Sequence, residues 1–193
     1  MQAAKQPARR SSPVLTWLFV ILTAVAVNLF LFTTVGISGS SMEPTLHHGE
    51  RALVPRFELW WKRLTGGSWE RGNIVFFPDP QADCHLRCPW VIKRIVGLPG
   101  ETVAIRQGVV LINGAELSEP YLAGEWPGSF VMAEITVPDG SFFVLGDNRY
   151  PYGAHDSRSY GPVDADSIGG RASAVLWPPF RSADGLSLNW RPL

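Results

Sequence analysis

This 193-residue chain has few cysteines and a formal net charge of zero. Cys84 and Cys88 are its only cysteines, which excludes a disulfide-rich scaffold, and in this spacing they do not complete a usual zinc set even with a neighbouring histidine. We therefore predict no metal site and no cofactor. The formal net charge is zero, so nothing indicates a nucleic-acid partner. The length suits one domain plus a membrane segment, so no second folded domain is expected.

Charged side chains are missing altogether from residues 14–35. About 20 apolar residues are needed to span a hydrocarbon core of about 30 Å, whereas the apolar region of a cleavable signal peptide, the alternative interpretation, has about 7 to 15. Lys5, Arg9 and Arg10 precede this run with no acidic residue among them, so the positive-inside rule keeps the N-terminus cytoplasmic. The predicted organisation is single-pass: a cytoplasmic tail (1–13), a transmembrane helix (14–36) and an extracytoplasmic β-rich domain (37–193).

Beyond residue 66, short apolar runs alternate with Gly, Pro and Asn, a pattern typical of an all-β domain. Residues 109–112 are followed by Asn113 and Gly114, a strong hairpin signal, because a type I′ turn requires positive φ at both central residues. The predicted fold class is mainly β, an antiparallel β-sheet catalytic domain with one N-terminal transmembrane helix. Strands are expected over residues 51–54, 73–77, 90–96, 102–106, 109–112, 134–137, 141–145 and 171–177.

One segment between the apolar run and most of the predicted strands is amphipathic. Within residues 57–64, Trp60 and Trp61 stand beside Lys62 and Arg63. Such a helix suits a membrane interface, where indole rings and cations contact lipid headgroups, but it also suits ordinary packing against a core. The sequence leaves both interpretations open.

Five stretches carry the functional signal. Residues 41–46 read Ser-Met-Glu-Pro-Thr-Leu within a turn that, taken alone, is typical of a linker. The other stretches are 71–77, 92–100, 146–149 together with 156–158, and 169–178. In this order, the set resembles the conserved boxes of bacterial type I signal peptidases, membrane-bound serine endopeptidases with a Ser/Lys dyad.

The resemblance implies a role for each matching residue. Ser41 would be the nucleophile and Lys93 the general base, while backbone N–H groups, chiefly that of Ser41, would hold the oxyanion. Residues implied to bind the oxyanion or the substrate are Gly39, Ser40, Met42 and Pro44. Residues implied to support the site are Arg94, Gly146, Asp147, Asn148, Arg149, Asp156, Ser157 and Arg158, with ion pairs expected between Arg94 and Asp147 and between Asp156 and Arg158.

Strand periodicity indicates that Lys93 is buried. Successive side chains of a strand point to opposite faces, so Lys93 shares its face with Val91 and Ile95. Loss of solvent lowers the pKa of an ammonium from its ordinary value of about 10.4, which favours the neutral amine that a base requires. An arginine at this position would stay charged.

Two positions depart from the family pattern. Gly39 stands where some members have a serine whose hydroxyl helps to hold the oxyanion, so the hole would consist of backbone N–H groups. Ala154 stands where members usually have the serine that bonds the lysine, in a spacer (150–155) two residues longer than usual. The resemblance therefore leaves open which group orients Lys93.

The resemblance also implies the substrate and its surroundings. Signal peptides of exported precursors would bind as an extended strand on a sheet edge, with small residues, typically Ala, at the first and third positions before the cut. The implied location is the cytoplasmic (inner) membrane, with its lipids as partners and the chain as a monomer. An oxidising compartment outside that membrane would pair Cys84 with Cys88, while free thiols and metal binding remain the alternatives.

Two other functions stay open. Residues 155–157 are His-Asp-Ser, the residue types of a Ser/His/Asp hydrolase, although such triads assemble in space rather than in adjacent positions. A membrane-anchored β-domain that only binds peptides is the non-enzymatic alternative. It predicts no dependence of function on Ser41.

Overall fold

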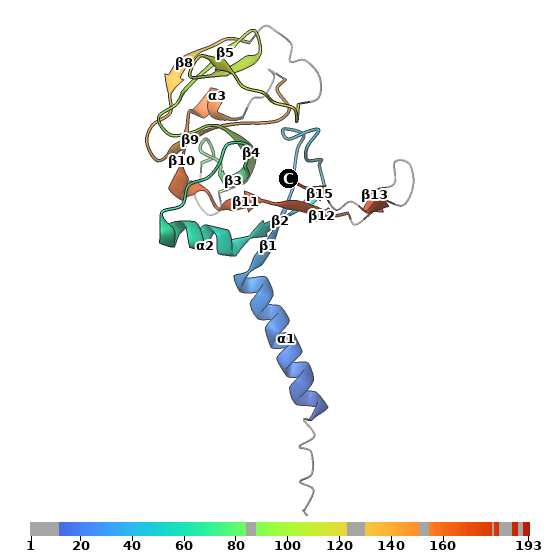
Figure 1. Cartoon of the computed structure of the whole chain (residues 1–193). Coiled ribbons are helices and arrows are strands. Elements are labelled where there is room, and N and C mark those ends of the chain that lie inside the picture. The colour runs from blue at the N-terminus through green and yellow to red at the C-terminus, as the bar shows by residue number, and fades with distance from the viewer. Residues whose placement is uncertain are drawn as a thin grey trace, which may run out of the picture.

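A computed structural model describes residues 12–83, 88–122, 130–150, 155–178, 180–181, 187–188 and 191–193 (Figure 1). A long helix, α1 (Pro13–Phe30), projects from a β-rich domain that holds the other elements. The other helices are α2 (Arg56–Thr65), α3 (Ser157–Tyr160) and the 3₁₀ turn η1 (Ala165–Ser167). The strands are β1 (Phe32–Gly36), β2 (Arg51–Pro55), β3 (Ile74–Pro78), β4 (Trp90–Gly97), β5 (Thr102–Arg106), β6 (Val109–Ile112), β7 (Ala115–Glu116), β8 (Met132–Thr136), β9 (Ser141–Leu145), β10 (Val163–Asp164), β11 (Gly170–Ala172), β12 (Ala174–Trp177), β13 (Phe180–Arg181), β14 (Ser187–Leu188) and β15 (Arg191–Pro192).

The predicted helix over residues 14–36 is wrong in its last part. The Ser12 side chain caps α1 by accepting a hydrogen bond from the Leu15 N–H, and the helix ends at Phe30. The chain then becomes β1, which pairs antiparallel with β2 along its whole length. Thr33, Thr34 and Val35 are β-branched and so favour an extended strand, and pairing with β2 satisfies their backbone groups. Within the described residues, no helix is both long enough and apolar enough to cross a membrane.

Antiparallel sheets form the domain, as predicted from the turn-rich sequence. The central sheet has the order β10-β9-β4-β3-β11, and a second sheet has the order β1-β2-β12-β15. A third sheet, β7-β6-β5-β8, lies at the end of the domain farthest from α1 (Figure 1). β4 pairs with β3 from Trp90 to Arg94 and with β9 only from Arg94 onward, so its first half has one unpaired edge among the described strands.

Most of the predicted strands are confirmed to within two residues. β5, β6 and β9 have the predicted bounds, and the hairpin between β6 and β7 turns on Asn113 (φ 51°) and Gly114 (φ 79°). The single strand predicted over residues 171–177 is instead two, β11 and β12, interrupted at Ser173. The interruption moves the chain from the central sheet, where β11 pairs with β3, to the second sheet, where β12 pairs with β2.

Three apolar clusters hold these sheets together. Alternation along β3 sends Ile74 and Phe76 to a cluster shared with the second sheet, and Val75 and Phe77 to a cluster on the opposite face. A third cluster joins the β5 and β6 hairpin to the end of the central sheet, through residues such as Phe143. Both faces of the central sheet are therefore covered, which explains why β3 reads as a continuous apolar run.

Candidate active site

Ser41 and Lys93 meet in the structure although they lie far apart in the sequence. Lys93 Nζ is 2.8 Å from Ser41 Oγ. Lys93 comes from the middle of β4 and is only 3% exposed, whereas Ser41 lies in the turn that follows β1. A hydroxyl at this distance from an amine is within reach of proton transfer.

Burial lowers the pKa of the Lys93 ammonium, and the positive charge of Arg158 lowers it further. The negative charges of Asp156, Asp79 and Asp147 act in the opposite direction, but the pKa remains below its ordinary value. The prediction that β4 carries a buried lysine is thus confirmed. The net effect favours the neutral amine, the form of Lys93 able to accept a proton.

Buried side chains and hydrogen bonds hold the turn that carries Ser41. Met42 and Leu46 are fully buried in the cluster between the central and second sheets, and the Leu46 N–H donates to the Met42 carbonyl at 2.9 Å. Arg191 donates both to the Thr45 carbonyl (2.8 Å) and to the buried Glu50 carboxylate (2.7 Å). These contacts hold the turn in place and give Met42 and Leu46 a structural role.

The loop that begins at Gly146 fixes the other side of Ser41. The Asn148 N–H donates to the Ser41 carbonyl at 3.0 Å, and the Asn148 amide donates to the Ser40 carbonyl at 3.2 Å. A Cβ atom on Gly146 would lie 2.5 Å from the same Ser41 carbonyl oxygen. Glycine is therefore required at this position by the close approach of two backbones.

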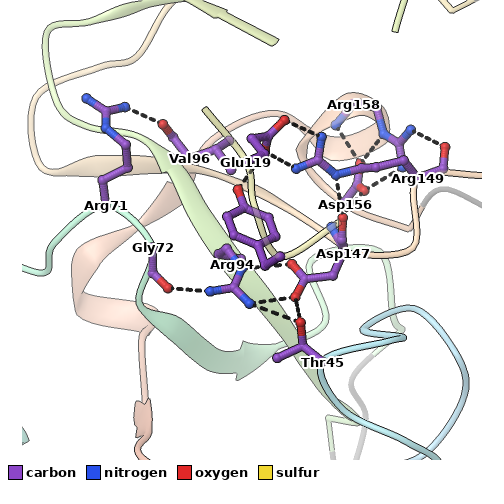
Figure 2. Close-up of polar contacts among 12 residues, drawn as sticks. Thr45, Arg71, Gly72, Arg94, Val96, Glu119, Asp147, Arg149, Asp156 and Arg158 are labelled. Atoms are coloured by element: carbon purple, nitrogen blue, oxygen red, sulfur yellow. Dashed lines mark hydrogen bonds and ion pairs between the residues drawn. The ribbon is translucent and has the colours of Figure 1, made fainter. Parts of the chain in front are cut away.

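Arg94 and Asp147 form the first of the two predicted ion pairs. Arg94 Nε and Nη2 donate to the two oxygens of Asp147 at 2.8 and 2.6 Å, and both side chains are buried. Figure 2 shows Arg94 between Asp147, Thr45 and Gly72. The Thr45 hydroxyl donates to Asp147 at 2.5 Å, and Arg94 Nη1 donates to the Gly72 carbonyl at 2.9 Å. Because Arg94 follows Lys93 in β4, this pair links the strand that carries Lys93 to the Ser41 turn.

Asp156 and Arg158 form the second predicted ion pair. Arg158 Nε and Nη2 donate to Asp156 at 2.8 and 2.7 Å, and Asp156 also accepts from the Gly146 N–H at 3.2 Å. Asp156 caps the short helix α3, which holds the pair next to the loop at Gly146. The buried Ser157 hydroxyl accepts from the Val144 N–H at 2.9 Å, so it supports β9.

Two residues of this network were missed from the sequence. Glu119 accepts hydrogen bonds from both terminal nitrogens of Arg149, and the Tyr121 hydroxyl donates to Glu119 at 2.5 Å. The Tyr121 ring lies under the Arg94 guanidinium, 3.9 Å from ring centroid to carbon. Arg149 Nε in turn donates to the Gly146 carbonyl at 2.7 Å. No sequence signal pointed to Glu119 or Tyr121, because they follow β7 and reach the site only through the fold.

The structure does not assemble the alternative Ser/His/Asp site. His155 Nε2 lies 2.6 Å from an oxygen of Asp79, at the end of β3. Asp156 is bound to Arg158, and Ser157 is bound to the backbone of β9. Among the described residues, His155 has no hydrogen bond to a serine. The three adjacent residues therefore face different partners.

A cavity of about 100 Å³ opens beside Ser41 and Lys93. Its walls come from the end of β1, the turn that follows β1, the middle of β3 and the first half of β4. The lining residues are Val35, Gly36, Ser38, Ser41, Phe76, Trp90, Val91, Ile92 and Lys93. Apart from the dyad and Ser38 the lining is apolar or backbone, so the cavity suits a short uncharged side chain.

The remaining predicted positions are placed as follows. Gly39 has a positive φ of 86° and its N–H donates to His48 Nδ1, while Pro44 is exposed on the turn.

Cys88 is disulfide-bonded, whereas Cys84 lies outside the described residues. Ala154, which stands where family members usually have the serine that bonds the lysine, also lies outside them. Within the residues that the structure describes, no three His, Cys, Asp or Glu side chains are grouped to hold a metal ion.

Comparison with known proteins gives consistent matches. The profile of a family described as "Signal peptidase, peptidase S26" matches residues 10–177. The chain is 32% identical to a signal peptidase I of Bacillus licheniformis (90% of this chain, 94% of that protein) and 35% identical to one of Bacillus amyloliquefaciens (90% and 91%). A solved structure of a signal peptidase I from Enterococcus faecalis V583 is similar at 34% identity and a TM-score of 0.46, over 55% of this chain and 98% of that one.

Proposed function

The chain belongs to the peptidase S26 family of signal peptidases, and from this premise we propose that it cuts signal peptides from exported precursors with Ser41 as nucleophile and Lys93 as general base. The observation that supports this assignment is the 2.8 Å contact between the buried Lys93 Nζ and Ser41 Oγ, beside an open cavity. A neutral Lys93 takes the serine proton as Ser41 attacks the scissile carbonyl. The protonated Lys93 gives this proton to the leaving amine as the peptide bond breaks, which leaves an ester on Ser41. The neutral Lys93 then takes a proton from the water that attacks the ester and returns it to Ser41 as the ester bond breaks.

The architecture around the cavity supports an extended substrate. β1 pairs only with β2 among the described strands, and residues 90–93 of β4 pair only with β3, so both present unpaired backbone groups next to the cavity. A substrate segment can add to such edges as a further strand. The small apolar cavity favours small residues, typically Ala, at the first and third positions before the cut.

The groups invoked for chemistry all come from one chain, and we propose that the enzyme acts as a monomer. Backbone N–H groups of the turn, chiefly that of Ser41, would hold the oxyanion, since Gly39 offers no hydroxyl. A preorganised turn is suited to this task because it needs no rearrangement during the reaction. The contacts of Met42, Leu46 and Asn148 give the turn that rigidity.

Cleavage of a precursor with an Ala-x-Ala site by the purified full chain tests the proposal. Ser41→Ala should lower kcat by a factor on the order of 10⁴ to 10⁶, the loss expected when a nucleophile is removed. His155→Ala, the matched control, should keep most of the activity. Normal cleavage by Ser41→Ala would leave a binding protein or another nucleophile as the explanation, and loss of activity in His155→Ala alone would restore the Ser/His/Asp alternative.

We further propose that α1 holds the chain at the cytoplasmic membrane, with residues 1–13 inside and the β-rich domain outside. Support comes from its exposed apolar side chains and from the basic residues that precede it. Eighteen helical residues rise about 27 Å, slightly less than a hydrocarbon core of about 30 Å, and a bilayer can thin locally around a short helix. Protease added to intact spheroplasts should digest the domain and spare the tail, and the reverse pattern would contradict this orientation.

A further inference from the structure

The apolar stripe of α2 faces away from the domain. Phe57, Trp60, Trp61 and Leu64 recur at the spacing of one helical face, and they are 45%, 43%, 67% and 82% exposed. In an ordinary surface helix the apolar stripe packs on the core and the polar face meets water. The orientation of α2 is the opposite, and an exposed apolar patch of this kind marks an interaction surface.

Contacts on the other face fix this orientation. Arg171 of β11 donates to both carboxylate oxygens of Glu58, at 3.0 and 2.5 Å. Leu59 packs against an apolar cluster of the central sheet, and Lys62 Nζ lies 4.9 Å from the centroid of the buried Trp69 ring. The polar face is therefore bound to the domain, and the helix cannot rotate its stripe inward without breaking these contacts.

The exposed stripe continues the apolar surface of α1. Phe30 at the end of α1 meets the Trp60 ring edge-on, with 6.1 Å between ring centroids, and Phe32 of β1 meets Phe57 at the same distance. The Arg56 N–H that opens α2 donates to the Leu31 carbonyl at 2.8 Å. Figure 1 shows α2 at the base of the domain, near the end of α1 that joins β1.

We propose that α2 lies in the membrane–water interface, with its stripe in the lipid and the exposed Arg63 at the headgroups. Indole rings prefer this zone, and an amphipathic helix that lies in the plane of the bilayer buries such a stripe. This inference rests on the proposed attachment through α1, with which the stripe is continuous. Together the two helices set the height and tilt of the domain, and hence the position of Ser41 relative to a bilayer-embedded substrate.

A nitroxide probe on the full chain in vesicles of phosphatidylcholine and phosphatidylglycerol tests the location directly. Trp61→Cys would carry the label, and Val131→Cys would be the control, since Val131 is 68% exposed just before β8, at the end of the domain farthest from α1. Position 61 should be accessible to oxygen and protected from a water-soluble nickel chelate, and position 131 the reverse. Equal nickel access at both positions would overturn the inference, as would protection of position 61 that persists in detergent and accompanies dimerisation.

Cleavage assays test the consequence for the reaction. The double variant Trp61→Ser, Leu64→Ser should cut a short soluble peptide as well as wild type does, because neither side chain touches the site. It should cut a precursor embedded in vesicles about 10- to 100-fold more slowly, the loss expected when reacting groups are held slightly out of position. Val131→Ser should match wild type on both substrates. Equal loss on both substrates, or none on either, would reject the role of α2, whereas a wild-type chain inactive on the soluble peptide would instead reject the proposed function.

Discussion

A lysine can act as a base only while its amine is neutral, and burial is what favours that form of Lys93. The buried Lys93 amine lies 2.8 Å from the Ser41 hydroxyl, which is only partly buried. The negative charges nearby work against the neutral form, yet two of them are engaged by arginines, Asp147 by Arg94 and Asp156 by Arg158. These ion pairs thus reduce the charge that Lys93 experiences as well as holding the loops in place.

The pH dependence of cleavage follows from the lowered pKa of Lys93. Because the protonated amine is inactive, activity should rise with pH, and the rise should be centred below the ordinary lysine value of about 10.4. Lys93→Arg keeps the charge but cannot lose it, so this variant should be as inactive as Lys93→Ala from pH 6 to 10. Substantial cleavage by Lys93→Arg would eliminate Lys93 as the base.

Gly146→Ala is expected to displace the Ser41 backbone. The new Cβ would lie 2.5 Å from the Ser41 carbonyl oxygen, closer than any ordinary contact, so one of the two segments must shift. A shift of this size should lower kcat about 10- to 100-fold, with a smaller change in KM. Steady-state kinetics on a soluble peptide, together with a melting curve to show that the variant is folded, checks this. Unchanged kcat in a folded Gly146→Ala variant would contradict the close packing.

At the scale of elements, the active site lies where β4 changes partners. Its first half pairs with β3 alone and its second half adds β9, so Lys93 is the last residue before the strand becomes paired on both sides. The loop at Gly146 begins where β9 ends, directly after Leu145, which pairs with Arg94. The backbone of one strand pair therefore positions both Lys93 and the loop that binds Ser41.

The third sheet reaches this loop through the segment after β7. Glu119→Gln removes a carboxylate that accepts hydrogen bonds from both Arg149 and Tyr121, and charged hydrogen bonds of this kind contribute about 1.5 to 3 kcal/mol. Since Arg149 holds the Gly146 carbonyl, we expect kcat to fall about tenfold or more in addition to the lower melting temperature.

Glu101→Gln is the matched control for Glu119→Gln. Glu101 also pairs with an arginine, Arg71, at 2.5 Å, but that pair holds the strand ends near Leu98 and Val96 rather than the loop at Gly146. Glu101→Gln should lower the melting temperature, while kcat stays near the wild-type value. If both variants lose kcat to the same extent, the effect of Glu119 is on general stability and the link to the loop is wrong.

At the scale of the whole molecule, apolar clusters join the sheets, and ion pairs link segments that are distant in the sequence. Glu50 is an example: burial acts to raise its pKa, but hydrogen bonds from Arg191 and from the His47 N–H outweigh burial and lower it. Arg191 belongs to β15 near the C-terminus, while Glu50 directly precedes β2. The charged form of Glu50 therefore links β15, near the C-terminus, to the start of β2 in the same sheet.

Acid should weaken the ion pair between Glu50 and Arg191. Because the pKa of Glu50 is lower in the folded chain than the ordinary 4.5, its contribution to stability is fully present above that value and is lost as the pH falls through the lowered pKa. The melting temperature of wild type in detergent should therefore drop between pH 5 and pH 3 more steeply than that of Glu50→Gln. At pH 7, Glu50→Gln should already melt a few degrees lower. Parallel pH profiles for the two proteins would refute this contribution.

The sequence by itself determined what depends on local pattern. Short apolar runs between turn residues located most strands, and the Asn113 and Gly114 pair located a hairpin. The order of five stretches identified the family, and the resemblance predicts Ser41 and Lys93 as the dyad. A residue's type and its near neighbours carry this information, because strand burial and turn geometry are properties of short segments.

Only the tertiary structure decided what depends on contacts between distant segments. The apolar run gave no sign that its last residues form β1, because the partner that makes them a strand, β2, comes later in the chain. Glu119 and Tyr121 have no local signature, and the stripe of α2 reads the same whether it faces a core or a membrane. Which partner an extended segment pairs with, and which way an amphipathic helix turns, is set by the sum of long-range contacts, to which no single segment contributes more than a small part.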